Sequence, residues 1–297
     1  MEAAPDSENS FVVDLMTTLR KEKFRSHGWY RFFKRSWQMS WNTANANPTL
    51  KRSWAHTAIC ITALAIVMLG ISFFFEGSGV ALRLLPGFLF CIAWQQSDLF
   101  WHLGLNRQTQ TGKLLPVVGL ATTLTSLRGV AASFLFGRLA GGISTSSELA
   151  LLIFLVGIAT DMIDGPIARC TGTQTKLGQI GDGEADFCLY LAITVILIQN
   201  GILPLWLGMV MLLRFLVPLV AALGSYFLLA RPVRFGSTIW GKLAGLAQTL
   251  YFLVLLAPGQ ISALTQVAYF PLLLATLILL VMAPLVQIME NVRDARV

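Results

Sequence analysis

The sequence predicts an all-α, polytopic integral membrane protein, with a six-helix core and an amino-terminal extension of about two further transmembrane helices. Its mean hydropathy is +0.67, and only 12% of its 297 residues are charged, whereas soluble domains average about 25%. Several apolar runs approach the roughly 20 residues that a helix needs to cross a bilayer. A β-barrel would need short segments of alternating polarity, so the long unbroken runs argue against that class.

Eight hydrophobic segments define the expected membrane helices. An amino-terminal pair covers 57–75 and 79–96. Arg83 and Pro86 interrupt the second segment, which leaves a re-entrant loop as an alternative at that place. The six later segments are 117–140, 147–165, 184–200, 203–229, 240–258 and 263–287.

A polar stretch at 95–113 separates the helix pair from the later segments, and it is interpreted as a cytoplasmic linker and a domain boundary. The first expected domain, 1–115, holds a basic segment, the helix pair and the linker. The second, 116–297, holds the six-helix core. No internal repeat or low-complexity tract divides the chain further.

The distribution of positive charge predicts the orientation in the membrane. Residues 1–54 hold nine of the 22 Lys and Arg residues, and we expect them to be cytoplasmic. Alternation of the helices then places the loops 166–183 and 230–240, and the carboxyl terminus, on the same side. Those places carry Arg169, Lys176, Arg231, Arg234, Arg293 and Arg296, while the opposite loops carry only Arg138, with Arg83 nearby.

The basic amino-terminal segment contains the run WYRFFKRSWQMSW at 29–41, in which aromatic and basic residues interleave. One interpretation is a positive-inside flank of the first membrane helix. The other is an amphipathic segment on anionic lipid, with Trp and Phe in the interface and Arg and Lys on headgroups. No recognised nucleic-acid-binding module accompanies the charge, so a nucleic-acid partner is not expected.

Five of the 15 acidic residues fall between positions 161 and 186 in an otherwise apolar chain. Asp161 and Asp164 are three apart at the end of one expected helix, and Asp182 and Asp186 are four apart on the next. On a helix, each pair shares one face. Two such faces on antiparallel helices would gather four carboxylates at the cytoplasmic edge of the membrane.

Four carboxylates this close repel one another strongly, and Arg169 alone cannot balance them. Divalent cations are the natural counter-charge, and oxygen ligands suit Mg²⁺, Mn²⁺ or Ca²⁺ better than zinc. Two such ions can clamp the attacking and leaving oxygens of an in-line displacement, so a phosphate substrate is indicated. Gly165 and Ala168 remove side-chain bulk beside a ligand, and Arg169 offers a donor fork to a diphosphate.

The chain between these acids is expected to form a short turn. Gly172 and Gly178 punctuate it, since glycine is favoured where a backbone must reverse. A single Asp in such a place is often a helix cap, but four acids at helical spacing are not explained by capping.

At these residues the sequence resembles the CDP-alcohol phosphatidyltransferase family. The resemblance covers roughly 117–290, and its signature matches at eight fixed residues over 26 positions. The matching pattern is Asp161-x-x-Asp164-Gly165-x-x-Ala168-Arg169, eight further residues, then Gly178-x-x-x-Asp182-x-x-x-Asp186.

The resemblance implies a role for each matching residue. Two metal ions, Mg²⁺ or Mn²⁺, would be held by Asp161, Asp164, Asp182 and Asp186, and Asp186 would also take the proton of the acceptor hydroxyl. The CDP moiety would be contacted by Asp164, Gly165, Ala168, Arg169, Lys176 and Gly178. The implied reaction is attack of an alcohol oxygen on the β-phosphorus of CDP-diacylglycerol, with CMP leaving. A homodimer in the lipid bilayer is implied by the resemblance alone.

Two weaker matches bear on the acceptor alcohol. The stretch ATTLTSLRG at 121–129 resembles the entry segment of phosphatidylglycerophosphate synthases at Thr125 and Arg128, but Ala121 and Thr122 stand where Pro-Asn is usual. A later segment matches the same enzymes at Gly241, Lys242 and Gln248, while Gly245 replaces the usual Thr.

Arg128, Arg214 and Lys242 are therefore candidates for a pocket that binds a phosphorylated acceptor such as glycerol 3-phosphate. Snorkelling at a helix start is the alternative for Lys242. Inositol phosphate, serine, or a CDP-aminoalcohol reacting with diacylglycerol remain open as substrates.

Two further interpretations stay open at this stage. Asp98 and His102 are four apart, and a satisfied polar patch at a helix end is favoured there over a metal or acid–base site. A transporter or a non-catalytic scaffold would also keep membrane carboxylates. The acids gather at one edge and no inverted repeat is visible, which favours the enzyme.

Overall fold

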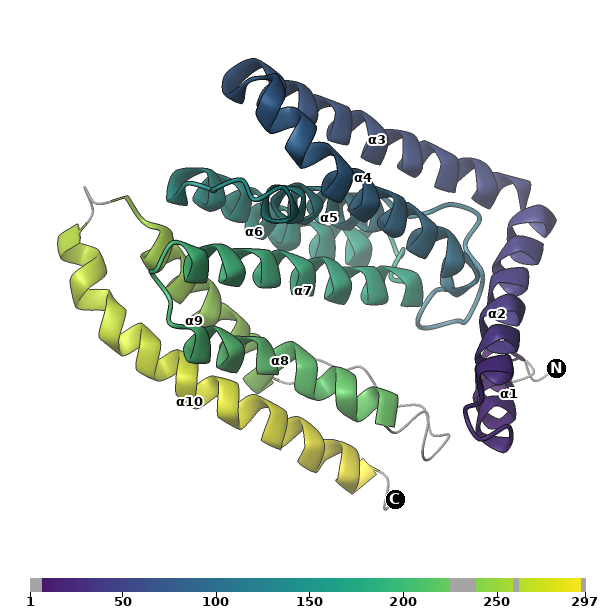
Figure 1. The fold of residues 1–297 in the computed structure, drawn as a ribbon. Helices are drawn as coiled ribbons and strands as arrows, with labels where there is room; N and C mark the ends of the chain where they lie inside the picture. The colour runs from purple at the N-terminus through teal and green to yellow at the C-terminus, as the bar shows by residue number, and fades with distance from the viewer. Residues whose placement is uncertain (1–6, 225–238, 259–261, 295–297) are drawn as a thin grey trace. The chain divides into compact units, whose positions relative to one another are not determined.

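The protein is described by a computed structural model that covers residues 7–224, 239–258 and 262–294. This part of the chain contains ten α-helices and no strand, so the predicted all-α class is confirmed (Figure 1). Two helices, α1 (Ser7–Lys21) and α2 (Ser26–Ala46), precede the hydrophobic segments. Those segments correspond to α3 (Pro48–Glu76), α4 (Ser78–Trp101), α5 (Leu120–Ala140), α6 (Ser147–Cys170), α7 (Lys176–Gln199), α8 (Leu205–Gly224), α9 (Ile239–Leu256) and α10 (Ser262–Asp294).

Among the helices of the described residues, four are long and apolar enough to cross a membrane: α3, α4, α6 and α9. Shorter apolar stretches lie in α8 and α10, and α5 and α7 carry the polar residues described below. Helix α4 is continuous through Pro86 over 24 residues and is long enough to cross the membrane, which favours a spanning helix over a re-entrant loop. The chain is an integral membrane protein of the polytopic helical class.

The chain divides into two compact units, one of residues 35–196 and the other of 1–34 together with 197–297. In the first unit, α3 and α4 pack against each other and against α5. In the second, α10 packs along α8 and α9. The domain boundary expected at 115/116 stays a prediction. Arg231, Arg234 and Arg296 lie outside the described residues.

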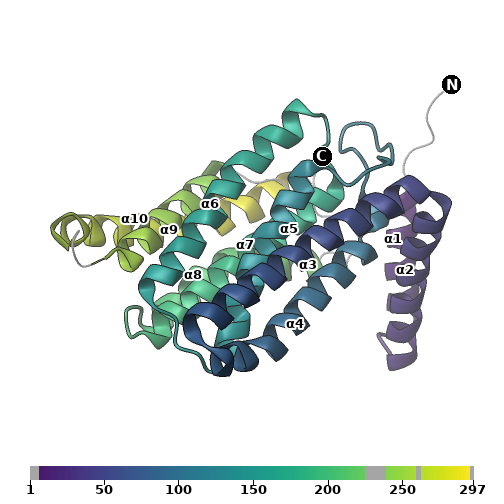
Figure 2. The ribbon, with the colours of Figure 1, turned by 90° about the horizontal axis from the view of Figure 1, so that it is seen from above.

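Helices α4 and α5 approach closely because small residues face each other. A β-carbon on Gly137 of α5 would lie 2.8 Å from side-chain atoms of both Leu84 and Phe88. One on Gly87 would lie 2.7 Å from the Ala140 side chain. Small residues let membrane helices pack without bulky side chains between their backbones. The α3–α4 hairpin, seen from above in Figure 2, is thereby joined to the first helix of the expected core.

An ion pair between a buried arginine and a partly exposed glutamate joins the hairpin to α5 at one end. The Arg138 side chain is 3% exposed, and its Nη1 donates to both carboxylate oxygens of Glu76 at 2.7 Å. The same guanidinium donates to Thr145 Oγ1 at 3.1 Å and to the Ser144 carbonyl at 2.8 Å. Arg138 is therefore a structural residue, and each of its three guanidinium nitrogens donates a hydrogen bond.

The linker that follows α4 is held by hydrogen bonds within itself and to the turn between α6 and α7. The amide of Asn106 donates to the carbonyls of Leu115 at 3.1 Å and Val117 at 2.8 Å, which closes the loop. Gln108 Nε2 donates to the Gly172 carbonyl at 2.9 Å, and Gln108 forms an isolated bridge with Thr175. The linker is thus hydrogen-bonded to the turn between the two halves of the signature, and these bonds restrain that turn.

We expect Glu76→Gln to lower the free energy of unfolding by about 1–3 kcal/mol, because it leaves the buried Arg138 charge without its carboxylate. Unfolding in mixed SDS–detergent micelles, followed by circular dichroism, measures the change. Arg83→Gln, which removes an exposed charge from α4, is the matched control. Equal losses in the two variants would show that the ion pair does not contribute.

Candidate active site

The turn between α6 and α7 differs from the sequence prediction at both ends. Helix α6 continues through Pro166 to Cys170, so the whole first half of the signature is helical. Gly172 lies in the turn with φ +63, the left-handed conformation that glycine favours. Thr175 Oγ1 accepts a hydrogen bond from the Gly178 amide at 3.0 Å and so caps the start of α7. The expectation that Gly178 belongs to the turn is therefore wrong.

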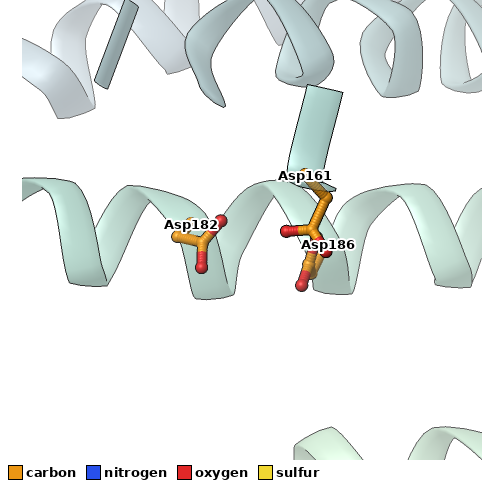
Figure 3. A group of neighbouring side chains, drawn as sticks. All are labelled: Asp161, Asp182 and Asp186. Atoms are coloured by element: carbon orange, nitrogen blue, oxygen red, sulfur yellow. The ribbon is translucent and has the colours of Figure 1, made fainter. Parts of the chain in front are cut away.

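Four carboxylates converge between the two helices, and we call them the carboxylate cluster. Asp161 and Asp164 come from α6, and Asp182 and Asp186 come from α7. One oxygen from each of Asp161, Asp182 and Asp186 lies within 4.8 Å of the others, and Figure 3 shows these three side chains together. The helical spacing of each pair places them on facing surfaces, as the sequence indicated.

A single arginine from α5 lies among all four side chains. Arg128 Nη1 donates to Asp161 Oδ1 at 2.7 Å and to Asp186 Oδ1 at 2.5 Å. Its Nη2 donates to Asp164 Oδ2 at 2.8 Å and to Asp182 Oδ1 at 2.6 Å. The Arg128 side chain is only 1% exposed. The sequence predicted Arg128 as part of an acceptor pocket and did not predict its contact with the acids.

The four carboxylate side chains differ in how far they are exposed to solvent. The side chains of Asp161 and Asp182 are 49% and 45% exposed, whereas that of Asp164 is 9% exposed. Asp164 also accepts a hydrogen bond from Thr125 Oγ1 at 3.0 Å. Asp164 is therefore the inner anchor, and a ligand would reach the cluster from the side of Asp161 and Asp182. Thr125 and Arg128 are three apart on α5, a spacing that could have indicated their shared face.

The donor set fits a hard divalent cation. All candidate ligand atoms are carboxylate oxygens, the type that Mg²⁺ and Mn²⁺ prefer. One guanidinium neutralises only one of the four charges when all the acids are ionised. The site therefore keeps a strong excess of negative charge near a membrane helix, where it is costly without further cations.

The remaining residues of the signature have distinct surroundings. A β-carbon on Gly165 would lie 3.3 Å from Arg169 Nη1, so the absence of a side chain lets the exposed guanidinium fold over the helix backbone. Ala168 and Lys176 are partly buried. A β-carbon on Gly178 would lie 3.1 Å from Thr122 Oγ1 of α5, which gives this glycine a role in helix packing.

The second unit contains the other two residues assigned to the acceptor pocket. Arg214 of α8 donates through Nη1 to Gln248 Oε1 of α9 at 3.3 Å, and its guanidinium lies 4.8 Å over the Phe215 ring. A β-carbon on Gly245 would come within 2.7 Å of Arg214 Nη2. The glycine that replaces the usual Thr therefore makes room for Arg214. Lys242 is exposed on α9.

A second polar group lies on the opposite face of α7 from the cluster. His102 Nδ1 is 3.1 Å from Asp98 Oδ1 at the end of α4, and Asp98 also hydrogen-bonds Glu184 of α7. Burial lowers the pKa of His102, but the hydrogen bond and charge of Asp98 outweigh it, so the net pKa is raised. The polar-patch interpretation had not included Glu184, because only the tertiary fold brings α7 beside α4.

The fold and the site together define a helical membrane enzyme with an acidic centre suited to phosphate chemistry. The profile of the CDP-alcohol phosphatidyltransferase family matches residues 118–286, more than half of the chain. The chain belongs to that family and is an enzyme of phosphatidyl transfer in phospholipid biosynthesis.

Individual relatives agree with this assignment. Two proteins of Mycobacterium tuberculosis, from strains CDC 1551 and H37Rv, are each described as a probable phosphatidylglycerophosphate synthase. Each is 29% identical over 174 residues, which cover 57% of this chain and 83% of the relative. No solved structure matches the chain.

The raised pKa of His102 gives a signed pH dependence. Because the folded pKa lies above the ordinary value of 6.5, the ion pair contributes fully below about pH 6.5, and its contribution is lost as the pH rises through the raised pKa. We expect His102→Gln to remove roughly 0.2–1 kcal/mol of unfolding free energy at pH 6 and less at pH 9. Thermal unfolding in detergent at both values measures this, with exposed His27→Gln as the control. A loss that is the same at both pH values would contradict the assignment.

Proposed function

We propose that the enzyme transfers the phosphatidyl group of CDP-diacylglycerol to a hydroxyl of a small phosphorylated alcohol, such as glycerol 3-phosphate, and releases CMP. The observation that supports this most directly is the convergence of four carboxylates from α6 and α7 in a chain of this family. The similarity to two proteins described as phosphatidylglycerophosphate synthases supports the choice of acceptor.

The carboxylate cluster would hold two Mg²⁺ or Mn²⁺ ions through Asp161, Asp164, Asp182 and Asp186. When bound, such ions neutralise the diphosphate and stabilise the charge that develops on the attacking and leaving oxygens. The exposed Asp161 and Asp182 would face the substrate, while the buried Asp164 and its Thr125 hydrogen bond would keep the inner wall fixed. Arg169, whose guanidinium lies over Gly165, would donate to the diphosphate.

Asp186 is the proposed general base. The acceptor oxygen forms a bond to the β-phosphorus of CDP-diacylglycerol, while the bond from that phosphorus to the bridging oxygen breaks and its electron pair leaves with CMP. The hydroxyl proton passes to the Asp186 carboxylate. Asp186 is 25% exposed, so one side of this carboxylate is open to an incoming alcohol.

Lys242 and Arg214 are the proposed contacts for the phosphate of the acceptor. Arg214 already meets Gln248 and lies beside Gly245, so its guanidinium is held in a defined place on α8. Arg128 was a third candidate, but its four terminal N–H groups are engaged by the cluster. The excess of basic residues near the signature supports an active site and an amino terminus on the cytoplasmic side. A homodimer is proposed from family membership alone.

The acceptor is tested with purified full-length protein, CDP-diacylglycerol, Mn²⁺ and a panel of labelled alcohols, with release of CMP as the readout. Selective use of glycerol 3-phosphate would support the proposal. Selective use of inositol phosphate or serine would show that the acceptor is a different alcohol from the one proposed. Turnover of a CDP-aminoalcohol with diacylglycerol would replace the proposed donor.

We expect Asp186→Asn to lower the rate of transfer at least about 100-fold, since a positioned base typically contributes 10²–10⁴-fold. The amide cannot accept the proton but nearly keeps the shape of the side chain. Glu148→Gln, at the exposed opposite end of α6, is the control and should retain the wild-type rate. Wild-type turnover by Asp186→Asn would remove this residue from the proposed role of base.

A further inference from the structure

Arg128 donates one hydrogen bond to each of the four aspartates of the carboxylate cluster. A guanidinium has four terminal N–H bonds, and each terminal nitrogen of Arg128 is bonded to two different carboxylates. The contacts span 2.5–2.8 Å, the range of charge-assisted hydrogen bonds. No terminal donor is left for another ligand.

A divalent ion would need the same oxygens. Mg²⁺ sits about 2.0–2.1 Å from its oxygen ligands, so an ion on any of these oxygens would lie within about 5 Å of the guanidinium. Two positive centres at that distance repel in a buried site, where solvent screens them poorly. We propose that Arg128 competes with the metal ions for the carboxylate cluster and leaves it when they bind. This inference rests on the metal chemistry of the proposed function.

The fifth donor of Arg128 supports a second position for the side chain. Within the described part of the chain, Nε is buried without a hydrogen-bond partner. A buried unsatisfied donor is unfavourable, so the present arrangement does not satisfy the whole guanidinium group. The pairing with four acids offsets that cost only while the acids lack another cation.

The choice of arginine fits this role. A lysine ammonium has three donors and no planar fork, so it cannot bond all four carboxylates in the same way. In the metal-free protein, Arg128 keeps four like charges assembled between α6 and α7. It also occupies Asp186 Oδ1 at 2.5 Å, so this oxygen is not open to an acceptor hydroxyl until the guanidinium departs. Metal loading and the release of the base are thereby coupled.

The test is Mn²⁺ binding to the purified full-length protein, measured by electron paramagnetic resonance without substrate. We expect Arg128→Gln to lower the dissociation constant for Mn²⁺ roughly tenfold, the size of effect that one opposite charge commonly has on proton binding by a carboxylate. Arg128→Lys should fall between the two. The control is Arg138→Lys, a second buried arginine of α5, which is paired with Glu76 and should leave Mn²⁺ binding unchanged.

Weaker or unchanged Mn²⁺ binding in both Arg128 variants would overturn the inference and leave the proposed function intact. If no variant binds Mn²⁺, the metal chemistry of the proposed function fails as well. Thermal unfolding gives a readout independent of binding. Arg128→Gln should melt below the wild type without metal and should gain more from added Mn²⁺. If Arg128→Gln does not fold without metal, Arg128→Lys carries the comparison.

A separate observation concerns α2. Tyr30, Phe33, Trp37 and Trp41 are exposed, and their spacing of three, four and four residues puts them in one stripe along the helix. Arg31, Lys34 and Arg35 are exposed beside the stripe, and Lys34 Nζ lies 5.9 Å from the centre of the Tyr30 ring. This pattern of aromatic and basic side chains is typical of a helix at a membrane interface.

Helix α2 is joined to the end of α4 beside this stripe. The Trp37 and Trp41 rings lie 5.3 and 5.9 Å from the Phe100 ring of α4. Ser40 Oγ donates to the Trp101 carbonyl, and Trp101 Nε1 donates to Ser36 Oγ at 2.6 Å. Trp101 is the last residue of α4, one of the helices long enough to cross the membrane. We infer that the aromatic stripe of α2 lies in the bilayer interface and that its basic residues bind anionic lipid headgroups.

Spin labels test this on the full-length protein in nanodiscs, after the free cysteines are replaced by serine. Labels at Phe33→Cys and Trp37→Cys should collide with oxygen more than with a polar nickel complex. Labels at the exposed Asn42→Cys and Ala46→Cys, on the other side of α2, should show the reverse. The contrast should grow when phosphatidylglycerol replaces part of the phosphatidylcholine. Equal access of the nickel complex to both faces would overturn the inference, and protection without lipid dependence would indicate a protein partner.

Discussion

The bonds from one arginine to four aspartates are the interaction on which the site depends. The acids lie at the ends of helices that are otherwise apolar, and like charges so close would drive α6 and α7 apart. Arg128 supplies counter-charge from a third helix, so α5, α6 and α7 are held by the same group that defines the site. Helix packing and local electrostatics are therefore linked at this place.

The amino-terminal hairpin contributes to that arrangement. It packs on α5 through glycines, and Arg138 and Glu76 fix one end of the contact. At the other end, Gln108 of the linker bonds the turn between α6 and α7. The extension thus steadies both the helix that carries Arg128 and the turn that carries the signature. Its contacts give it a structural reason to accompany the family core.

Much of the site was predictable from local sequence. The acids are three and four apart, and helical periodicity alone puts each pair on one face. The contact between Arg128 and these acids was not predictable, because it depends on the rotation and depth of α5 against two other helices. The same holds for Gly178 and Gly245. The sequence suggested that Gly178 contacts a ligand, whereas the structure shows it packed closely on Thr122. The sequence showed Gly245 only as a departure from a motif, whereas the structure shows that it makes room for Arg214.

The sequence by itself determined the membrane class, the helical segments and the grouping of the acids, because hydropathy and helical period are properties of short stretches of chain. The tertiary structure decided which cation meets those acids, which glycines serve packing, and that Glu184 joins Asp98 and His102. These are contacts between residues far apart in the chain. Such contacts depend on how helices pack, and a long charged side chain can reach different partners from the same backbone position.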